Sequence, residues 1–447
     1  MEELSFPKDF VWGVAAASYQ IEGAAREDGR GESIWDVFAR TPGKVHAGES
    51  GEVACDHYHR YAEDVALMKG LGVGSYRFSI AWPRVFPEGR GRRNPKGFDF
   101  YERLVDALLE AGIEPAATLY HWDLPQALED SGGWPARDTA YALGDYAAAC
   151  YDALGDRVKT WITLNEPWCS SYLSYGYGEH APGKRDEALA LRAVHHLNLA
   201  HALALEAFRG SGRAGKLGIT LNLSTPRPAG SSPEDLEAAE LAIDRDSRVF
   251  TGPLAGKGYP KRWLEKRGVA GLLPVQPGDL EKIAKPIDFL GLNYYTEHAV
   301  AADPGAPDGG RVVPQGHPET HMGWPVVPDG FLRQLRWVAR EFPGLPLYVT
   351  ENGAAYPDPE KPEDGRVHDP ERIAYLRGHL GACSRAVAEG VPLKGYYLWT
   401  LLDNFEWAWG YSRRFGIVHT DYRTLARTPK DSYYWYRDLI ASRPSSG

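Results

Sequence analysis

The fold is decided by Trp161-Ile162-Thr163-Leu164-Asn165-Glu166-Pro167, where an apolar, β-branched run stops abruptly at a glutamate and a turn-forming residue. The same arrangement returns far along the chain in Leu347-Tyr348-Val349-Thr350-Glu351-Asn352-Gly353. Both runs have the composition of a buried strand. A buried strand that ends in a carboxylate directs that carboxylate toward whatever lies above the strand end. The sequence therefore predicts two glutamates at strand ends, and the fold determines whether they meet.

Short β-rich runs alternate with longer amphipathic stretches along the whole chain. The predicted strands are Val11–Ala15, Ser75–Ile80, Pro115–Tyr120, Thr160–Leu164, Leu217–Leu221, Phe289–Asn293, Leu347–Thr350 and Tyr396–Trp399. The main predicted helices are Tyr58–Leu71, Phe98–Ala111, Arg137–Leu154, Ala188–Arg209, Phe331–Phe342 and Pro370–Glu389. Eight strands alternating with helices indicate parallel βαβ units, and eight strands are the number that closes a barrel. We therefore expect an α/β fold, a single (β/α)8 TIM barrel with long loops at its carboxyl-terminal face.

No domain linker interrupts this series, although a chain of 447 residues is long enough for two or three domains. The Pro- and Gly-rich segment Ala302–Gly330 is followed by another helix and strand of the series. We interpret this segment as a long loop at the mouth of the site. Residues 1–447 are therefore expected to form one barrel domain that carries all the catalytic groups.

Composition and charge argue against several classes of protein. The formal net charge of −10 does not suit a nucleic-acid surface, which needs a concentrated basic stripe. Charged and polar residues interrupt the longest apolar helical stretch, Ala188–Phe208, so no membrane span is expected, and Met1–Ser5 lacks a signal-peptide pattern. Four cysteines lie far apart without Cys-x-x-Cys spacing, which predicts neither a disulfide framework nor a zinc site. We expect a cytoplasmic protein without a cofactor; its oligomeric state is not predicted.

Polar or aromatic groups follow every predicted strand, at the end where a parallel barrel places its chemistry. In chain order they are Gln20, Arg77, His121-Trp122-Asp123, Asn165-Glu166, Asn222, Asn293 with Tyr295, Glu351, and Trp399. Polar groups at all eight ends are not expected of a purely structural barrel. Because glycosidic bond cleavage is the chemistry that most often uses two carboxylates, Glu166 and Glu351 are candidate catalytic residues.

The chain resembles the family 1 glycoside hydrolases, and most of all the bacterial β-glucosidases among these retaining barrels, over nearly its full length. The motifs that carry the resemblance are Phe10-Val11-Trp12-Gly13-Val14-Ala15-Ala16-Ala17-Ser18-Tyr19-Gln20-Ile21-Glu22-Gly23, Asn165-Glu166-Pro167, Thr350-Glu351-Asn352-Gly353, His121-Trp122, Asn293-Tyr294-Tyr295, and Trp399 through Phe405-Glu406-Trp407. The resemblance implies a retaining β-glycosidase that works by double displacement through a covalent glycosyl-enzyme. Glu351 would then be the nucleophile, with Arg77 and Tyr295 beside it, and Glu166 the general acid/base.

The resemblance also implies a sugar-binding site and a leaving-group site. The sugar-binding residues implied are Gln20, His121, Trp122, Asn165, Asn293, Trp399, Glu406, Trp407 and Phe415. Core packing is the alternative for the two tryptophans Trp399 and Trp407, but the polar segment Asp403–Trp407 favours a binding loop. The aglycone-site residues implied are Trp168, Leu173, His180, Asn222 and Trp324. The expected substrates are the terminal β-D-glucosyl residues of cello-oligosaccharides and of aryl or alkyl glycosides, with β-fucosides and β-galactosides in addition, and with transglycosylation as a hypothesis.

One alternative is a 6-phospho-β-glycosidase. In similar enzymes that act on phosphorylated glycosides, the loop around Glu406 carries small and basic residues that receive the phosphate. An acidic residue at this position repels a phosphate dianion, which favours the neutral sugar. Arg413 and Arg414 lie close by in sequence and keep this alternative open.

Three more classes of protein fit the sequence less well. A metal-dependent barrel enzyme would use histidines such as His57 with His59 or His195 with His201, but these pairs do not converge at predicted strand ends. A non-catalytic sugar-binding barrel would usually lack one of the two glutamates, and both are present. A nucleotide-dependent enzyme would need a Gly-x-Gly-x-x-Gly or P-loop pattern after a strand, and none is found.

Overall fold

The computed structural model describes residues 4–359, 361–362 and 364–442, and its centre is the predicted barrel. The barrel strands are β1 (Val11–Ala15), β2 (Ser75–Ser79), β3 (Glu114–Tyr120), β4 (Thr160–Asn165), β5 (Lys216–Leu221), β7 (Phe289–Asn293), β10 (Leu347–Asn352) and β11 (Leu393–Trp399). They pair in parallel in the closed order β1-β11-β10-β7-β5-β4-β3-β2. The predicted fold class is therefore confirmed, with strand ends that differ by a few residues at most.

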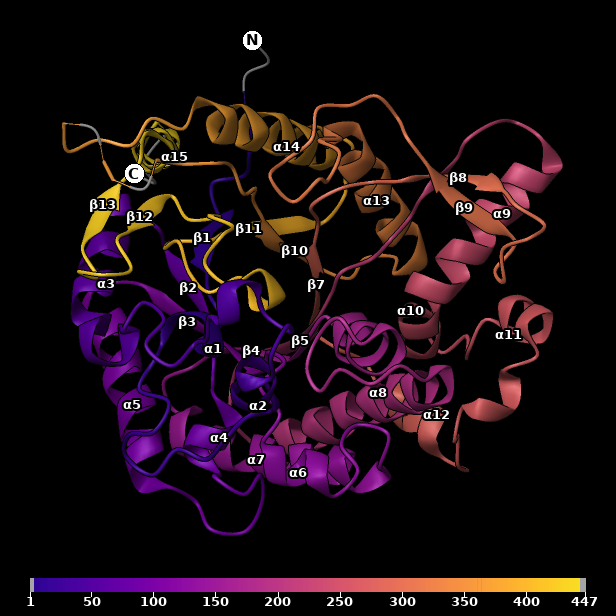
Figure 1. Ribbon diagram of the computed structural model, residues 1–447, viewed down its shortest axis with the longest axis horizontal. Coiled ribbons are helices and arrows are strands. Elements are labelled where there is room, and N and C mark those ends of the chain that lie inside the picture. The colour runs from indigo at the N-terminus through magenta and orange to yellow at the C-terminus, as the bar shows by residue number, and fades with distance from the viewer. Residues whose placement is uncertain (1–3, 360, 363, 443–447) are drawn as a thin grey trace.

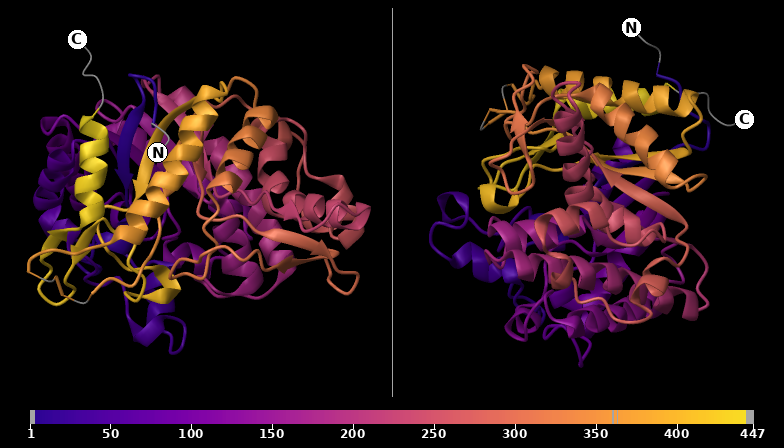
Figure 2. Two further views of the ribbon diagram at one scale, coloured as in Figure 1. Left: turned by 90° about the horizontal axis from the view of Figure 1, so that it is seen from above. Right: turned by 90° about the vertical axis from the view of Figure 1, so that its right-hand side faces the viewer.

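Long helices surround the barrel, as Figure 1 shows. They are α3 (His57–Leu71), α5 (Pro95–Glu110), α7 (Arg137–Leu154), α8 (Glu187–Gly210), α13 (Pro328–Glu341), α14 (Pro370–Ala388) and the carboxyl-terminal α15 (Asp431–Ala441). Figure 2 shows α13, α14 and α15 running alongside one another on one outer face. Helices α5 and α13 begin one turn earlier than predicted, because Pro95 and Pro328 occupy their first helical positions, where a missing N–H costs nothing.

The segments between the main elements contain more structure than the sequence indicated. Short helices between β5 and β7 are α9 (Pro233–Ile243), α10 (Val249–Leu254), α11 (Lys261–Arg267) and α12 (Asp279–Ile283). Elsewhere lie α1 (Ser18–Ile21), α2 (Ile34–Arg40), α4 (Trp82–Val85), α6 (Gln126–Asp130), the single turns η1 (His46–Gly48), η4 (Ala270–Leu272) and η5 (Trp407–Trp409), and the wider-turned segments η2 (Cys169–Tyr177) and η3 (Asp244–Arg248).

The prediction that Ala302–Gly330 is entirely loop is wrong. Strand β9 (Gly310–Val313) lies within it and pairs antiparallel with β8 (Ala299–Ala302), while β6 (Arg227–Pro228) completes a small separate sheet. Figure 1 shows β8 and β9 beside α9, away from the barrel axis. A second hairpin, β12 (Val418–Thr420) with β13 (Arg427–Pro429), precedes α15.

The barrel strands are almost entirely buried: β2, β7 and β10 are buried at every residue, as expected for parallel strands covered on both faces. Five tryptophans of the core are almost completely buried, namely Trp35, Trp82, Trp134, Trp161 and Trp263. Register shifts occur at the carboxyl ends of β4 and β10, next to Asn165 and Glu351. Such bulges change the direction in which a side chain points. Among the described residues, no helix is long and apolar enough to span a lipid bilayer.

Candidate active site

A cavity of about 560 Å3 opens at the carboxyl ends of the barrel strands. The predicted residues that line it are His121, Trp122, Glu166, Trp168, Leu173, His180, Asn222, Asn293, Tyr295, Trp324, Glu351, Trp399, Glu406, Trp407 and Phe415. The other three, Gln20, Arg77 and Asn165, are hydrogen-bonded to members of this set. All the residues predicted for the site are therefore brought together by the fold.

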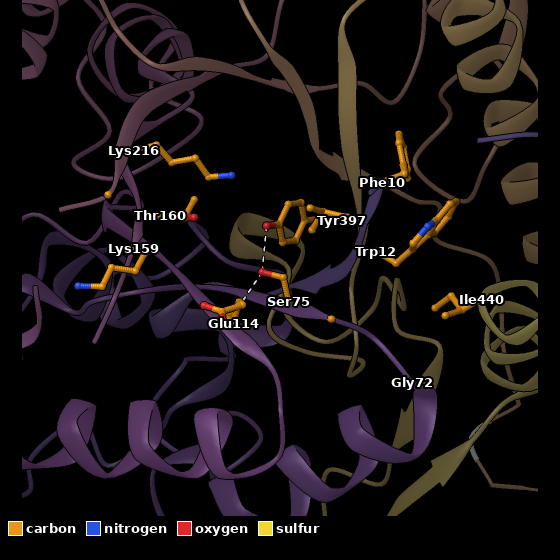
Figure 3. Close-up of a pocket in the computed structure, with 13 residues that line it drawn as sticks. Phe10, Trp12, Gly72, Ser75, Glu114, Lys159, Thr160, Lys216, Tyr397 and Ile440 are labelled. Atoms are coloured by element: carbon orange, nitrogen blue, oxygen red, sulfur yellow. Dashed lines mark hydrogen bonds between the residues drawn. The ribbon is translucent and has the colours of Figure 1, made fainter. Parts of the chain in front are cut away.

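A second cavity, of about 540 Å3, lies at the opposite end of the barrel, where the strands begin (Figure 3). Its lining includes Trp12, Ser75, Tyr397 and Lys216. The Ser75 hydroxyl is already hydrogen-bonded to the Tyr397 hydroxyl at 3.0 Å and to the backbone oxygen of Glu114 at 2.8 Å. Because this cavity has no pair of buried carboxyl groups among its lining residues, the candidate chemistry lies at the first cavity.

Glu351 is held between a cation and a phenol at the end of β10. Arg77 donates a hydrogen bond to Glu351 Oε1 at 2.7 Å, and the Tyr295 hydroxyl donates to Oε2 at 2.6 Å. Arg77 and Glu351 are both almost fully buried, 1% and 3% exposed. Burial raises the pKa of Glu351, while Arg77 and Tyr295 oppose that rise because they stabilise the ionised form. The prediction that Arg77 and Tyr295 lie against Glu351 is thus confirmed as geometry.

Glu166, at the end of β4, has different partners. Asn293 donates to Glu166 Oε1 at 2.5 Å, and the Cys169 thiol donates to Oε2 at 3.1 Å. Burial and the negative charge of Glu351 raise the pKa of Glu166 to about 8. The Glu166 backbone has a φ of 48°, in the left-handed region, and its N–H donates to Thr220 O at 3.0 Å, which holds this strained conformation in place. A carboxyl group that is neutral near pH 7 can donate a proton.

Asn165 connects the two glutamates with His121. Its Oδ1 accepts hydrogen bonds from Arg77 at 2.6 Å and from Asn293 at 3.1 Å, so its amide nitrogen is the donor to His121 Nε2 at 2.9 Å. His121 therefore carries its proton on Nδ1, and that buried atom has no hydrogen-bond partner among the described residues. Burial and Arg77 hold the pKa of His121 well below its ordinary value, so the ring is neutral.

Gln20 and Glu406 form a second polar group at the cavity. Gln20 Nε2 donates to Glu406 Oε2 at 3.2 Å and to Phe405 O at 2.9 Å, while the buried Gln20 Oε1 has no partner in the part of the chain that the structure describes. Burial and the charge of Glu351 raise the pKa of Glu406 to about 8. Unpaired buried polar atoms are costly, so Gln20 Oε1 and His121 Nδ1 together indicate a ligand that offers several hydrogen-bonding groups.

Trp399 and Trp407, for which core packing was the alternative prediction, both line the cavity. Each of these side chains is nevertheless only 4% exposed. Trp399 is stacked on His121 with ring centres 5.8 Å apart, and Trp407 packs against Trp122 at 4.5 Å. Trp122 Nε1 in turn donates to Asn165 O at 3.0 Å. These aromatic side chains are therefore packed into the core and present part of their surface to the cavity.

The residues predicted for the leaving-group side line the same cavity. Trp168 Nε1 donates to Asp246 Oδ1 at 3.2 Å, Trp324 packs against Tyr295 at 5.4 Å, and burial lowers the pKa of His180 to about 3. Asn222 donates to the sulfur of Cys169 at 3.4 Å. Sequence reasoning missed some lining residues, namely Cys169, Arg245, Asp246, His298, Val300, Val312, Met322 and Trp409. Cys169 could have been found from its position one helical turn after Glu166.

Of the two arginines that kept a phosphate site open, Arg414 is paired with an acidic residue, whereas Arg413 lies over a tryptophan ring that lines the cavity. Arg414 donates to Asp403 Oδ2 at 2.8 Å and to Thr420 O at 3.0 Å, and Arg413 lies over the Trp409 ring at 4.3 Å. Within the described part of the chain, no group of three or more His, Cys, Asp or Glu side chains is arranged to hold a metal ion. The arrangement supports chemistry carried out by the two carboxyl groups themselves.

Comparison with known proteins agrees with this geometry. The family model described as glycosyl hydrolase family 1 matches residues 2–444. Beta-glucosidase A of Thermotoga maritima is 49% identical over 98% of both chains. A bifunctional beta-D-glucosidase/beta-D-fucosidase of Bifidobacterium breve is 48% identical, again over 98% of both chains. The solved structure of the AHE enzyme from Alicyclobacillus herbarius superimposes with a TM-score of 0.95 at 52% identity, covering 99% of this chain and 100% of that one.

Proposed function

The chain belongs to glycosyl hydrolase family 1 and is a retaining β-glucosidase, and we propose that Glu351 is its nucleophile and Glu166 its general acid/base. One observation supports these roles above all others. Glu166 and Glu351 are buried carboxyl groups that line the same cavity, but Glu351 faces Arg77 and Tyr295, whereas Glu166 faces only an amide and a thiol. Their surroundings favour an ionised Glu351 beside a protonated Glu166.

In the first half of the reaction, Glu351 attacks the anomeric carbon of the bound glucoside. Arg77 and Tyr295 keep its carboxylate ionised and aimed by holding one oxygen each. As the glycosidic bond breaks, Glu166 transfers its proton to the departing oxygen, so the alcohol leaves neutral. The product is a covalent glucosyl-enzyme and an ionised Glu166.

In the second half, the same residues work in reverse. Formation of the ester removes the negative charge of Glu351, which is one of the two main causes of the raised Glu166 pKa. The pKa of Glu166 therefore falls, and its carboxylate accepts a proton from a water molecule that attacks the anomeric carbon. The ester bond breaks, Glu351 regains its charge, and the glucose keeps the configuration of the substrate.

The glucosyl unit is proposed to bind in the inner part of the cavity. Gln20 Oε1 and His121 Nδ1 are two buried groups for which the described residues supply no hydrogen-bond partner, and they supply an acceptor and a donor for sugar hydroxyls. Asn165 and Glu406 complete the polar side, with Asn165 next to the acid and placed for the 2-hydroxyl. Aromatic rings complete the apolar side, with Trp399 beneath the sugar ring, and the remaining residues of this set are Trp122, Asn293, Trp407 and Phe415.

The proposal extends beyond glucosides to β-D-fucosides and β-D-galactosides, to cello-oligosaccharides in cellulose degradation, and to transglycosylation. The residues proposed as the aglycone site, because they line the same cavity as the two glutamates, are Trp168, Leu173, His180, Asn222 and Trp324. We also propose that residues 1–447 act as one catalytic domain. A reducing cytoplasmic setting is proposed from the four cysteines, all of which are buried free thiols.

Neutral glucosides are expected to be strongly preferred over their 6-phosphates. The cavity already holds four buried carboxyl groups, Glu166, Asp246, Glu351 and Glu406, and Arg77 is committed to Glu351. A phosphate dianion would therefore meet several carboxyl groups, while Arg245 and Arg414 are already paired with Asp246 and Asp403. The expected result is kcat/KM at least about 100-fold lower for p-nitrophenyl 6-phospho-β-D-glucoside than for p-nitrophenyl β-D-glucoside. Comparable turnover of the two substrates would contradict the proposed function.

Replacing Tyr295 with phenylalanine is expected to move the acidic limb of the pH profile. The Tyr295 hydroxyl stabilises ionised Glu351, so its removal raises the pKa of Glu351. Nucleophilic attack needs the ionised form of Glu351. As the pH is lowered, the variant should therefore lose activity at a higher pH than the wild type does. The acidic limb of kcat/KM should shift upward by about one pH unit. The matched control is Tyr294→Phe, which removes a hydroxyl that donates to Val327 O and does not touch Glu351; an equal shift in both variants would refute this role.

A further inference from the structure

Cys169 lies one helical turn after Glu166, and its thiol contacts the Glu166 carboxyl group. The backbone N–H of Cys169 donates to Glu166 O at 2.9 Å, which starts the turn, and segment η2 begins at Cys169. This turn places Cys169 Sγ 3.1 Å from Glu166 Oε2. The other carboxyl oxygen accepts from Asn293, so each oxygen of Glu166 has one donor.

The direction of the thiol hydrogen bond follows from its neighbour. Asn222 donates its amide N–H to Cys169 Sγ at 3.4 Å, so the sulfur is the acceptor on that side. The S–H proton is then left to point at Glu166. Burial and the nearby charge of Glu166 raise the pKa of Cys169 well above its ordinary value, so the group remains a thiol and a donor. Cys169 is only 5% exposed, although it lines the cavity.

The other three cysteines have no comparable position. The Cys55 thiol donates to the backbone oxygen of Asp403 at 3.1 Å, and Cys150 and Cys383 lie in α7 and α14, on the outside of the barrel. All four are buried, so burial alone does not distinguish Cys169. What distinguishes it is direct contact with a carboxyl group that lines the cavity.

We propose that Cys169, oriented by Asn222, is a positioning residue that fixes the Glu166 carboxyl group and stabilises its ionised form. The inference rests on the proposed role of Glu166 as general acid/base. Glu166 must be protonated in the first half-reaction and ionised in the second. A thiol is a weak donor, so it supports the ionised form without holding it so firmly that the acid is lost. A hydrogen bond to the charged form lowers a carboxyl pKa.

The test is the alkaline limb of kcat/KM for p-nitrophenyl β-D-glucoside in Cys169→Ala and Cys169→Ser. Alanine removes the donor, so the pKa of Glu166 rises and the alkaline limb should move up by about half a pH unit. Serine restores a donor, so its limb should lie at or below that of the wild type. Cys383→Ala removes a buried thiol from α14 and should leave the limb where it is.

The outcomes separate this inference from the proposed function. Identical alkaline limbs in wild type, Cys169→Ala and Cys169→Ser would overturn the positioning role and leave Cys169 as packing only. A limb that moves equally in Cys169→Ala and Cys383→Ala would also overturn it, because general loosening would then be the cause. Glu166→Gln, measured with 2,4-dinitrophenyl β-D-glucoside, should show no alkaline limb; if the limb persists there, it is the proposed role of Glu166 that fails. Thermal unfolding midpoints of each variant confirm that folded enzymes are compared.

Discussion

Glu351→Gln is expected to lower kcat/KM for aryl β-D-glucosides by on the order of 10⁴-fold or more. The amide has nearly the shape of the carboxylate: its oxygen can accept from Arg77 and its nitrogen can donate to the Tyr295 hydroxyl oxygen, so the fold should persist. It cannot form the covalent bond to the anomeric carbon, which removes the double-displacement path. The measurement is steady-state hydrolysis at the optimum pH, with active-site purity checked so that traces of wild-type enzyme are excluded.

The chain offers a close control for this substitution. Glu22 is also a buried glutamate between an arginine and a tyrosine, accepting from Arg84 at 2.9 Å and from Tyr101 at 2.6 Å, and it does not line the cavity. Glu22→Gln should therefore keep much of the activity despite a comparable local change. In Glu351→Gly, azide should enter the vacated space and restore turnover, with α-glucosyl azide as the product. Near wild-type activity in Glu351→Gln would eliminate Glu351 as the nucleophile.

Glu166→Gln is expected to have an effect that depends on the leaving group. With cellobiose or an alkyl glucoside, the departing alcohol needs a proton, and loss of the general acid should lower kcat/KM by roughly 10³-fold. With 2,4-dinitrophenyl β-D-glucoside, the phenolate leaves without help, so kcat/KM should fall far less. Hydrolysis of the glucosyl-enzyme then becomes the slow step, because Glu166 no longer accepts a proton from water.

Two further measurements test the role of Glu166, one on Glu166→Gln and one on a control variant. The burst of dinitrophenolate before the steady state should become visible, since the covalent intermediate accumulates. Asn293→Ala removes the donor to Glu166 Oε1 and leaves the acid itself in place, so it should show a weaker dependence on the leaving group. Equal losses for cellobiose and the dinitrophenyl glucoside in Glu166→Gln would show that Glu166 is not the acid.

The barrel could be predicted from sequence because its strands are buried on both faces and appear as short apolar runs. Strand β9 could not, since Gly310–Val313 is four residues long and lies at the surface, where no apolar run marks it. The four helices between β5 and β7 are short, and their packing against α8 and η3 depends on distant parts of the chain. The local sequence pattern predicts an element where that element is strongly buried. It does not predict an element whose formation depends on tertiary contacts.

The meeting of Glu166 and Glu351 followed from topology, because parallel strands end at the same face of a barrel. The hydrogen bonds that give them different protonation states did not follow from it. Asn222 was assigned to the leaving-group site, and the structure shows that it also contacts Cys169. Arg414 lies close to Glu406 in sequence, but in the folded structure its guanidinium group donates to Asp403 instead. Which of several nearby groups forms a pair is set by geometry that sequence spacing does not contain.

Retention through a covalent glucosyl-enzyme is tested most directly by the anomer of glucose that is released first. Proton NMR should follow the hydrolysis of p-nitrophenyl β-D-glucoside by the wild-type enzyme from the first minutes, before mutarotation equilibrates the product. We expect β-D-glucose to appear first and the α-anomer to grow in later. Initial release of α-D-glucose would mean inversion by a single displacement, and it would contradict the assignment of Glu351 as nucleophile.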